Sequence, residues 1–218
     1  MNKGIITKLS SSRGLHSSEP NKDVARQCVN NRELLNEIAE YLTDKNPQLA
    51  ADCAEVMTEV AMTDPELTAK YAARLIPLLS HKYTRARWEA MHAIALVAEK
   101  VPDLIFSILP ELDVTMHRDK SVIVRDYATE SIARYAGTGK EAASKAYPIL
   151  TEILKVWGDK HASRVIEGFI RIYNLHPAFK NEFQKIADEY KESRRGVVKK
   201  AAMKLEKILN KDSIMNER

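Results

Sequence analysis

The chain has few of the residues on which β-rich and loop-rich proteins depend. Only 7 of its 218 residues are glycine, and aromatic residues make up 6%. A chain with so few of these residues, and with abundant Ala, Leu, Glu, Lys and Arg, favours helices over a β-sandwich. Disorder is not expected either, because apolar residues recur regularly from about Arg32 to Leu209.

Cysteines and long apolar runs are also scarce. Cys28 and Cys53 have no paired spacing, so the preferred interpretation is two reduced core thiols, with a disulfide or a zinc site as alternatives. No apolar run approaches ~18 residues, and no membrane-spanning segment is expected. The net charge of +4 permits an anionic partner without requiring one. We expect a cytoplasmic protein.

The first 18 residues contain no acidic side chain. Their basic, Ser-rich composition is also found in transit segments, but a flexible N-terminal arm over residues 1–30 is the preferred interpretation. A folded domain is expected over residues 31–210, followed by a C-terminal tail at 211–218.

One stretch shows the helical period clearly. From Val124 onward, small and apolar residues recur at three- and four-residue intervals as far as Ala136, and charged residues fall between them. Ser121 precedes this stretch as a candidate N-cap, and Gly137 follows it as a candidate C-terminal stop. The pattern predicts a helix from Val122 to Ala136.

The same pattern occurs five times. Small residues near the middle of each stretch are spaced by 36, 38, 40 and 33 positions: Ala54, Ala90, Ala128, Gly168 and Ala201. A further helical stretch precedes each one, at 32–42, 65–79, 102–112, 140–156 and 177–190. Helix pairs repeating at such a period stack so that each pair covers the apolar face of the next. The sequence therefore predicts a right-handed α-solenoid, or superhelix, of about five helix pairs.

The repeats resemble those of the HEAT/armadillo family. Prolines inside three of the first helices carry the resemblance, at Pro77, Pro110 and Pro148. So does the string Asp119-x4-Val124-Arg125-x2-Ala128, part of which recurs at Arg87-x2-Ala90 and Asp159-x4-Arg164. The resemblance implies HEAT-like pairs in which Asp and Arg side chains link neighbouring repeats. The first repeat lacks the Arg and the last lacks the Asp, so a continuous series of such links is not implied.

No catalytic set emerges from the sequence. The string from Gly137 to Lys140 lacks the spacing and the preceding strand of a nucleotide-binding loop. No triad and no convergent set of metal ligands can be assembled. We therefore expect no enzyme activity, no cofactor, no metal and no small-molecule substrate. HEAT-like DNA glycosylases remain a lesser alternative, for which Trp88, Trp157 and Asp159 are the candidate residues.

The leading hypothesis is an interaction scaffold that binds a protein partner in a groove lined by the second helices. The candidate groove residues are expected to be exposed, and they are Asp52, Glu55, Glu59, Glu89, Glu130, Arg134 and Arg171.

The alternative hypothesis is nucleic-acid binding. Basic residues recur in the turns between paired helices, and stacking would align these turns in a ridge that follows a phosphate backbone. The candidate ridge residues are Lys82, Arg85, Arg118, Lys120, Lys160, Arg194, Arg195, Lys199 and Lys200. Arg87, Arg125 and Arg164 are candidates for internal links instead.

Overall fold

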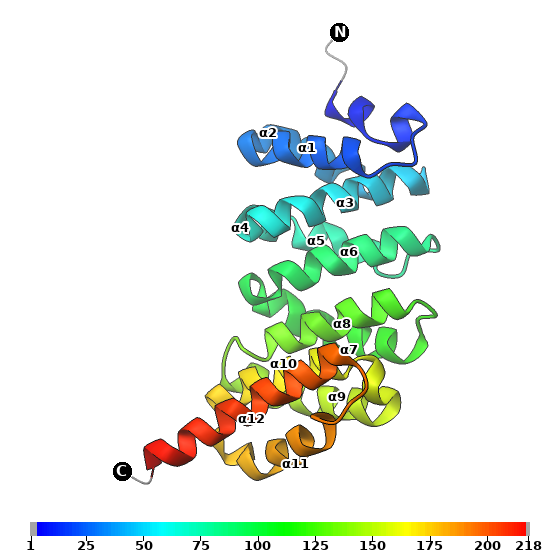
Figure 1. The fold of residues 1–218 in the computed structure, drawn as a ribbon. Helices are drawn as coiled ribbons and strands as arrows, with labels where there is room; N and C mark the ends of the chain where they lie inside the picture. The colour runs from blue at the N-terminus through cyan, green and yellow to red at the C-terminus, as the bar shows by residue number, and fades with distance from the viewer. Residues whose placement is uncertain (1–3, 217–218) are drawn as a thin grey trace. The chain divides into compact units, whose positions relative to one another are not determined.

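All regular structure in the described part of the chain is helical (Figure 1). The structure is a computed structural model that describes residues 4–216, with side chains described as far as Lys211. The chain divides into two compact units, Met1–Leu104 and Ile105–Arg218, which we call unit 1 and unit 2. Each unit is a stack of helix pairs, so the expected all-α solenoid fold is confirmed.

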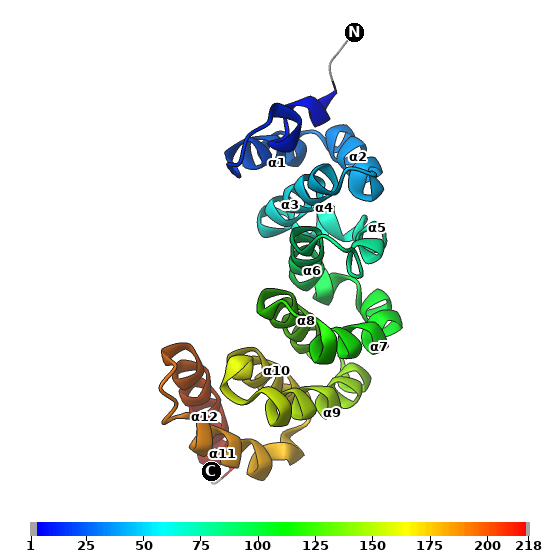
Figure 2. The same cartoon turned by 90° about the vertical axis from the view of Figure 1, so that its right-hand side faces the viewer.

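Unit 1 contains the first two helix pairs and a helical N-terminal segment. Its elements are η1 (Ile5–Lys8), η2 (Ser11–Arg13), α1 (Glu19–Asn30), α2 (Arg32–Glu40), η3 (Tyr41–Thr43), α3 (Pro47–Thr63), α4 (Pro65–Ala69), α5 (Ala72–Leu75), η4 (Ile76–Leu78), α6 (Thr84–Val97) and η5 (Ala98–Lys100), where η denotes a 3-10 helix. Figure 2 shows α1, α3 and α6 in one layer, with α2, α4 and α5 in the other.

Unit 2 contains the remaining three pairs. Its elements are α7 (Pro102–Arg118), α8 (Val122–Tyr135), α9 (Lys140–Trp157), η6 (Gly158–Lys160), α10 (Ala162–Leu175), η7 (Pro177–Phe179), α11 (Lys180–Tyr190) and α12 (Gly196–Asn216). The first residues of α7 belong to unit 1. The second helices α3, α6, α8, α10 and α12 all lie where the repeated pattern predicts them.

Polar caps set the starts of several helices. The Asn46 side chain accepts hydrogen bonds from the backbone amides of Gln48 and Leu49, so α3 begins at once after it. Ser121 caps α8 through the amide of Val124 at 3.4 Å, which confirms the predicted N-cap. Each cap satisfies backbone donors that have no partner within the helix.

Small residues lie where second helices approach their neighbours. Ala54, Ala90, Ala128 and Ala201 are all buried. A Cβ atom on Gly168 would lie 2.7 Å from Leu150 Cδ1, which is too close for a normal contact. The repeated small residue is therefore a packing requirement, because a larger side chain would hold the helices apart.

The N-terminal residues differ from the expected flexible arm. Residues 5–8 and 11–13 form short helical turns, and α1 packs against α3. Leu9 and Val24 are fully buried. The polar composition of residues 1–18 favoured a flexible arm, but buried apolar side chains such as Leu9 and Val24 anchor the segment.

The prolines of the first helices have different surroundings. Pro110 and Pro148 lie inside α7 and α9, as expected. Pro77 instead lies in η4, after α5 has ended. The first half of this pair is therefore divided into short helices, since a proline removes a backbone donor and crowds the preceding turn.

Both cysteines are free and fully buried, in agreement with the preferred interpretation. Burial, reinforced by the negative charge of Glu37, raises the pKa of Cys28 to about 12. Burial also raises the pKa of Cys53. Across residues 4–216, no helix combines the length and apolar character needed to cross a bilayer.

Candidate functional site

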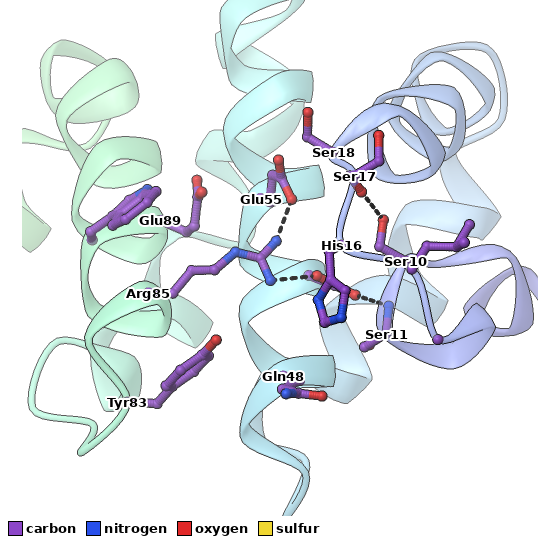
Figure 3. A pocket seen from close by; sticks show the side chains of 14 residues that line it. Ser10, Ser11, His16, Ser17, Ser18, Gln48, Glu55, Tyr83, Arg85 and Glu89 are labelled. Carbon is purple, nitrogen blue, oxygen red and sulfur yellow. Dashed lines mark hydrogen bonds and ion pairs between the residues drawn. The ribbon is translucent and has the colours of Figure 1, made fainter.

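One arginine links two acids across the second helices of unit 1. Asp52 and Glu55 are three residues apart in α3, so both side chains lie on the same face of that helix. Arg85, near the start of α6, lies opposite them. Its Nη1 is 2.7 Å from Asp52 Oδ1, and its Nη2 is 2.5 Å from Glu55 Oε2 (Figure 3). These two ion pairs therefore link the second helices α3 and α6.

Glu89 adds a third carboxyl group to this face. It lies one turn after Arg85 in α6, and only 6% of its surface is exposed. Burial, assisted by the negative charge of Glu55, raises the pKa of Glu89 to about 7. The charge of Arg85 opposes this shift, as do hydrogen bonds to Trp88 and Thr58, but the ion pairs of Arg85 are made with Asp52 and Glu55. Glu89 is therefore a titratable group within the physiological pH range.

The N-terminal segment completes the site. The Ser11 amide donates to Asp52 Oδ2 at 2.7 Å, and the Asn21 side-chain amide donates to Glu55 Oε2 at 2.6 Å. Figure 3 shows His16 and Ser10 on this segment, and on the opposite side Arg85 and Glu89 of α6 with Tyr83 just before that helix. Asp52 and Glu55 of α3 are thus contacted by Arg85 of α6 and by Ser11 and Asn21 of the N-terminal segment.

These elements enclose a hollow of about 500 Å³, which we call the α3–α6 hollow. Its lining residues are Ser10, Ser11, Gly14, Leu15, His16, Ser17, Ser18, Gln48, Asp52, Glu55, Tyr83, Arg85, Trp88 and Glu89. Three carboxyl groups outnumber the single arginine, so the hollow favours a cationic group. Tyr83 and Trp88 supply aromatic surface, which attracts a cation and the apolar stem of a long side chain.

Unit 2 repeats the link between second helices. Arg164, in the first turn of α10, lies 3.2 Å from Asp126 and 3.0 Å from Glu130, both in α8. The buried His161 ring contacts Asp126 through Nδ1 at 3.2 Å. Burial alone would raise the pKa of Asp126, but His161 and Arg164 lower it overall. Glu130 is shared with Arg134, at 2.7 Å.

A second hollow, of about 520 Å³, lies against α8, α10 and α12. We call it the α10–α12 hollow. Its lining residues are Asp126, Lys160, Ser163, Arg164, Glu167, Arg195, Val197, Lys200, Ala201 and Lys204. Five of these side chains are cationic and two are anionic. The electrostatic character is therefore opposite to that of the α3–α6 hollow.

The predicted groove residues lie on the second helices, but four of them are not exposed. Asp52, Glu55, Glu89 and Glu130 are buried, because three form ion pairs between helices and Glu89 lies beside them. The expectation of exposure was wrong for these four. Glu59, Arg134 and Arg171 are partly exposed. Arg171 lies near Glu167 on its own helix, at 3.9 Å.

The predicted ridge residues separate into two groups. Arg85 is used in the internal link and is only partly exposed. The others are exposed, namely Lys82, Arg118, Lys120, Lys160, Arg194, Arg195, Lys199 and Lys200. The structure brings Lys160, Arg195 and Lys200 together in the α10–α12 hollow. Lys199 instead lies 3.8 Å from Glu192.

Only one of the three arginines that were candidates for internal links joins two repeats. Arg164 forms the expected link between repeats. Arg87 and Arg125 donate to backbone carbonyls of their own preceding turns, those of His81 and Asp119 respectively. The Arg125 guanidinium also lies over the Trp157 ring, 4.2 Å from its centre.

The residues considered for a glycosylase have structural contacts. The Trp157 indole donates to the Met116 carbonyl at 3.1 Å, and Asp159 accepts from the Ser193 hydroxyl at 2.9 Å. Among the side chains described, no three His, Cys, Asp or Glu groups are placed to hold a metal ion.

Sequence reasoning missed several lining residues. The N-terminal residues 10–18 were assigned to an arm, and Glu167 was not considered for a site. One signal was present, however. Lys204 pairs with Glu167 at 2.8 Å, and the two residues are separated by about one repeat period, as are Arg164 and Asp126. Opposite charges one period apart in second helices therefore indicate such links.

No protein-family model matches the sequence, and no curated protein does. Several solved structures match the fold. An engineered protein has a TM-score of 0.69 at 16% identity, over 96% of this chain and 99% of that chain. A designed armadillo repeat protein has a TM-score of 0.67 at 15% identity, over 88% and 92%.

A third structure is described as that of computationally designed armadillo repeat proteins for modular peptide recognition. It has a TM-score of 0.66 at 15% identity, over 93% of this chain and 97% of that chain. At these identities the likeness concerns the fold. On this basis the chain has the all-α repeat-solenoid fold of the designed armadillo proteins.

Proposed function

We propose that the protein is a non-enzymatic scaffold that binds a segment of another protein along its second helices. The observation that carries this proposal is Glu89, a buried carboxyl group beside two further acids that already share the only arginine lining the hollow. Burying an ionisable group in this way costs stability. Groups whose pKa is shifted by burial and by neighbouring charges concentrate at functional sites.

The α3–α6 hollow fits a lysine or arginine side chain of the partner. A cation entering it would meet Glu89, with Tyr83 and Trp88 beside its stem. A similar fold has been designed for modular peptide recognition, which supports a peptide segment as the bound form. Repeat stacking also presents the successive second helices of each unit as a surface for an extended chain.

The experiment begins with capture of partners from cells that naturally produce the protein, followed by purification of one captured partner. Affinity is then measured by calorimetry with the wild type and with Glu89→Gln, which removes the charge but keeps the shape. We expect about tenfold weaker binding for the variant, the loss of one charge-assisted contact.

Glu40→Gln is the matched control, because Glu40 is an exposed residue of the first helix α2. It should bind the partner as the wild type does. Equal affinities for wild type, Glu89→Gln and Glu59→Gln would contradict the proposal for this face.

A second candidate function is binding of a nucleic-acid backbone. The exposed lysines and arginines of unit 2 favour it, since such side chains bind phosphates with a strong dependence on salt. An electrophoretic titration of duplex DNA and of RNA at low salt tests it. A complex that is weakened by Lys120→Glu, Arg194→Glu and Lys200→Glu together would support it, and the absence of any shift would exclude it.

A further inference from the structure

We propose that the α10–α12 hollow binds an anionic side chain of the partner segment, either a phosphorylated residue or a pair of acidic residues. This inference rests on the proposed function, because it assigns a second recognition point on the second helices. It concerns unit 2 alone and requires no contribution from the α3–α6 hollow.

The charge of the hollow is only partly neutralised. Arg164 pairs with Asp126 and Glu130, and Lys204 pairs with Glu167 at 2.8 Å. Lys160, Arg195 and Lys200 make no ion pair of this kind among the described residues. The Arg195 guanidinium donates to the Asp159 backbone carbonyl, which leaves its positive charge uncompensated. Three cations therefore converge on one hollow with their charge available.

Two of these cations are oriented by fixed neighbours. The Lys160 ammonium lies over the Trp157 ring, 5.3 Å from its centre, and Trp157 is itself held by Met116. The Arg195 guanidinium donates to the Asp159 backbone carbonyl, and the Asp159 side chain accepts from the Ser193 hydroxyl at 2.9 Å. Such orientation lowers the entropy cost of binding an anion.

The shape of the hollow favours a side chain over a nucleic-acid backbone. Its cations surround a volume of about 520 Å³. Val197 and Ala201 provide apolar lining, which suits the stem of an amino-acid side chain. Asp126 and Glu167 also border the hollow, but both are already paired, with Arg164 and Lys204 respectively. A single dianionic phosphate meets several lysine and arginine donors at once.

The test uses fluorescein-labelled peptides and fluorescence anisotropy with the full chain at low salt. One peptide contains only glycine and serine, a second carries one phosphoserine at its centre, and a third carries two glutamates there. A labelled single-stranded DNA of about 20 nucleotides is the fourth probe. We expect saturable binding of the phosphoserine or the diglutamate peptide, and no binding of the uncharged peptide.

The double variant Lys160→Glu with Lys200→Glu should weaken that binding about tenfold or more. Lys155→Glu with Lys185→Glu is the matched control, because it makes the same change in net charge at exposed positions of α9 and α11. The control should bind within about twofold of the wild type. Lys160→Gln with Lys200→Gln repeats the test without introducing negative charge.

Three results would overturn the inference. They are equal weakening in both double variants, no preference for the anionic peptides over the uncharged one, or tighter binding of the DNA that depends on Lys160 and Lys200. None of them bears on the α3–α6 hollow, whose test uses Glu89→Gln and the purified partner. Failure of this inference is therefore distinguishable from failure of the proposed function.

Discussion

Arg85 Nη1 lies 2.7 Å from Asp52 Oδ1, and the Asp52 side chain is completely buried. The same guanidinium binds Glu55, so one cation of α6 compensates two acids of α3. Arg164 of α10 repeats the arrangement with Asp126 and Glu130 of α8. A cation in the first turn of one second helix thus joins it to the acids of the preceding one within each unit.

Removing the guanidinium of Arg85 should destabilise the protein strongly. Arg85→Met keeps the length and packing of the side chain but leaves Asp52 and Glu55 buried without a counter-charge. We expect a loss of about 3 kcal/mol in the free energy of unfolding, measured by urea denaturation at pH 7. The triple variant that adds Asp52→Asn and Glu55→Gln should recover part of this loss.

Lys100→Met serves as the comparison for this prediction. Lys100 pairs with Glu66 at 2.6 Å, but both side chains are well exposed, at 40% and 68%. An exposed ion pair contributes little to stability, so no measurable change is expected. A similar loss in the free energy of unfolding for Lys100→Met and Arg85→Met would show that burial does not determine how much an ion pair contributes to stability.

Glu89 should make stability depend on pH. Its pKa is raised to about 7 in the folded chain from an ordinary value near 4.5, so the folded state holds a proton that the unfolded state releases. The folded chain therefore loses stability as pH rises from about 4.5 to 7. At pH 8, Glu89→Gln should be more stable than the wild type by about 3 kcal/mol.

The two proteins should converge at pH 4, where Glu89 is neutral in both states. Thermal or urea unfolding across pH 4–8 measures the difference. If Glu89→Gln is less stable than the wild type at pH 8, the carboxylate is stabilised by its surroundings and its buried charge is not available for a ligand.

The two thiols should be unreactive in the native protein. Alkylation requires the thiolate, and burial raises the pKa values of both Cys28 and Cys53. We expect iodoacetamide at pH 8 to label both cysteines in urea and neither under native conditions, as read by mass spectrometry. Rapid native labelling of Cys28 alone would show that α1 separates readily from α3.

Replacing Gly168 by a residue with a side chain of moderate size should destabilise the protein. Its added Cβ would meet Leu150 Cδ1 at 2.7 Å and Ala133 Cβ at 3.0 Å. Gly168→Val should therefore cost about 3 kcal/mol despite the better helix propensity of valine. Gly196→Val is the comparison, because a Cβ there has open space. Equal unfolding midpoints for the two variants would contradict the packing argument.

The helix pairs could be predicted from the sequence because the signals that define each pair lie within that pair's own residues. The stripe that starts at Val124 defines α8, Ser121 defines its start, and the small residue near the middle of each repeat marks the closest approach of helices. These signals are local or recur at one period, so no knowledge of distant contacts was needed. The apolar anchors Leu9 and Val24 were missed because they are too few to form a period.

The candidate site could be predicted only in part. Asp52, Glu55, Glu89 and Glu130 lie on second helices, as the repeat pattern indicates. A sequence does not show, however, whether a charge has a partner. Arg85 was assigned to a ridge, but it forms ion pairs with two acids, Asp52 and Glu55, so neither Arg85 nor these acids are free on the surface. Lys160, Arg195 and Lys200 gather in one hollow only through the packing of α12 against α10.

The sequence by itself determined the helical repeats, because apolar periodicity and capping act within a few residues of the chain. Only the tertiary structure decided which charges are paired, how deeply they are buried and where cations remain available. The physical reason is that the energy of a charge depends on its neighbours in space and on its access to water, and both are fixed by how the second helices pack.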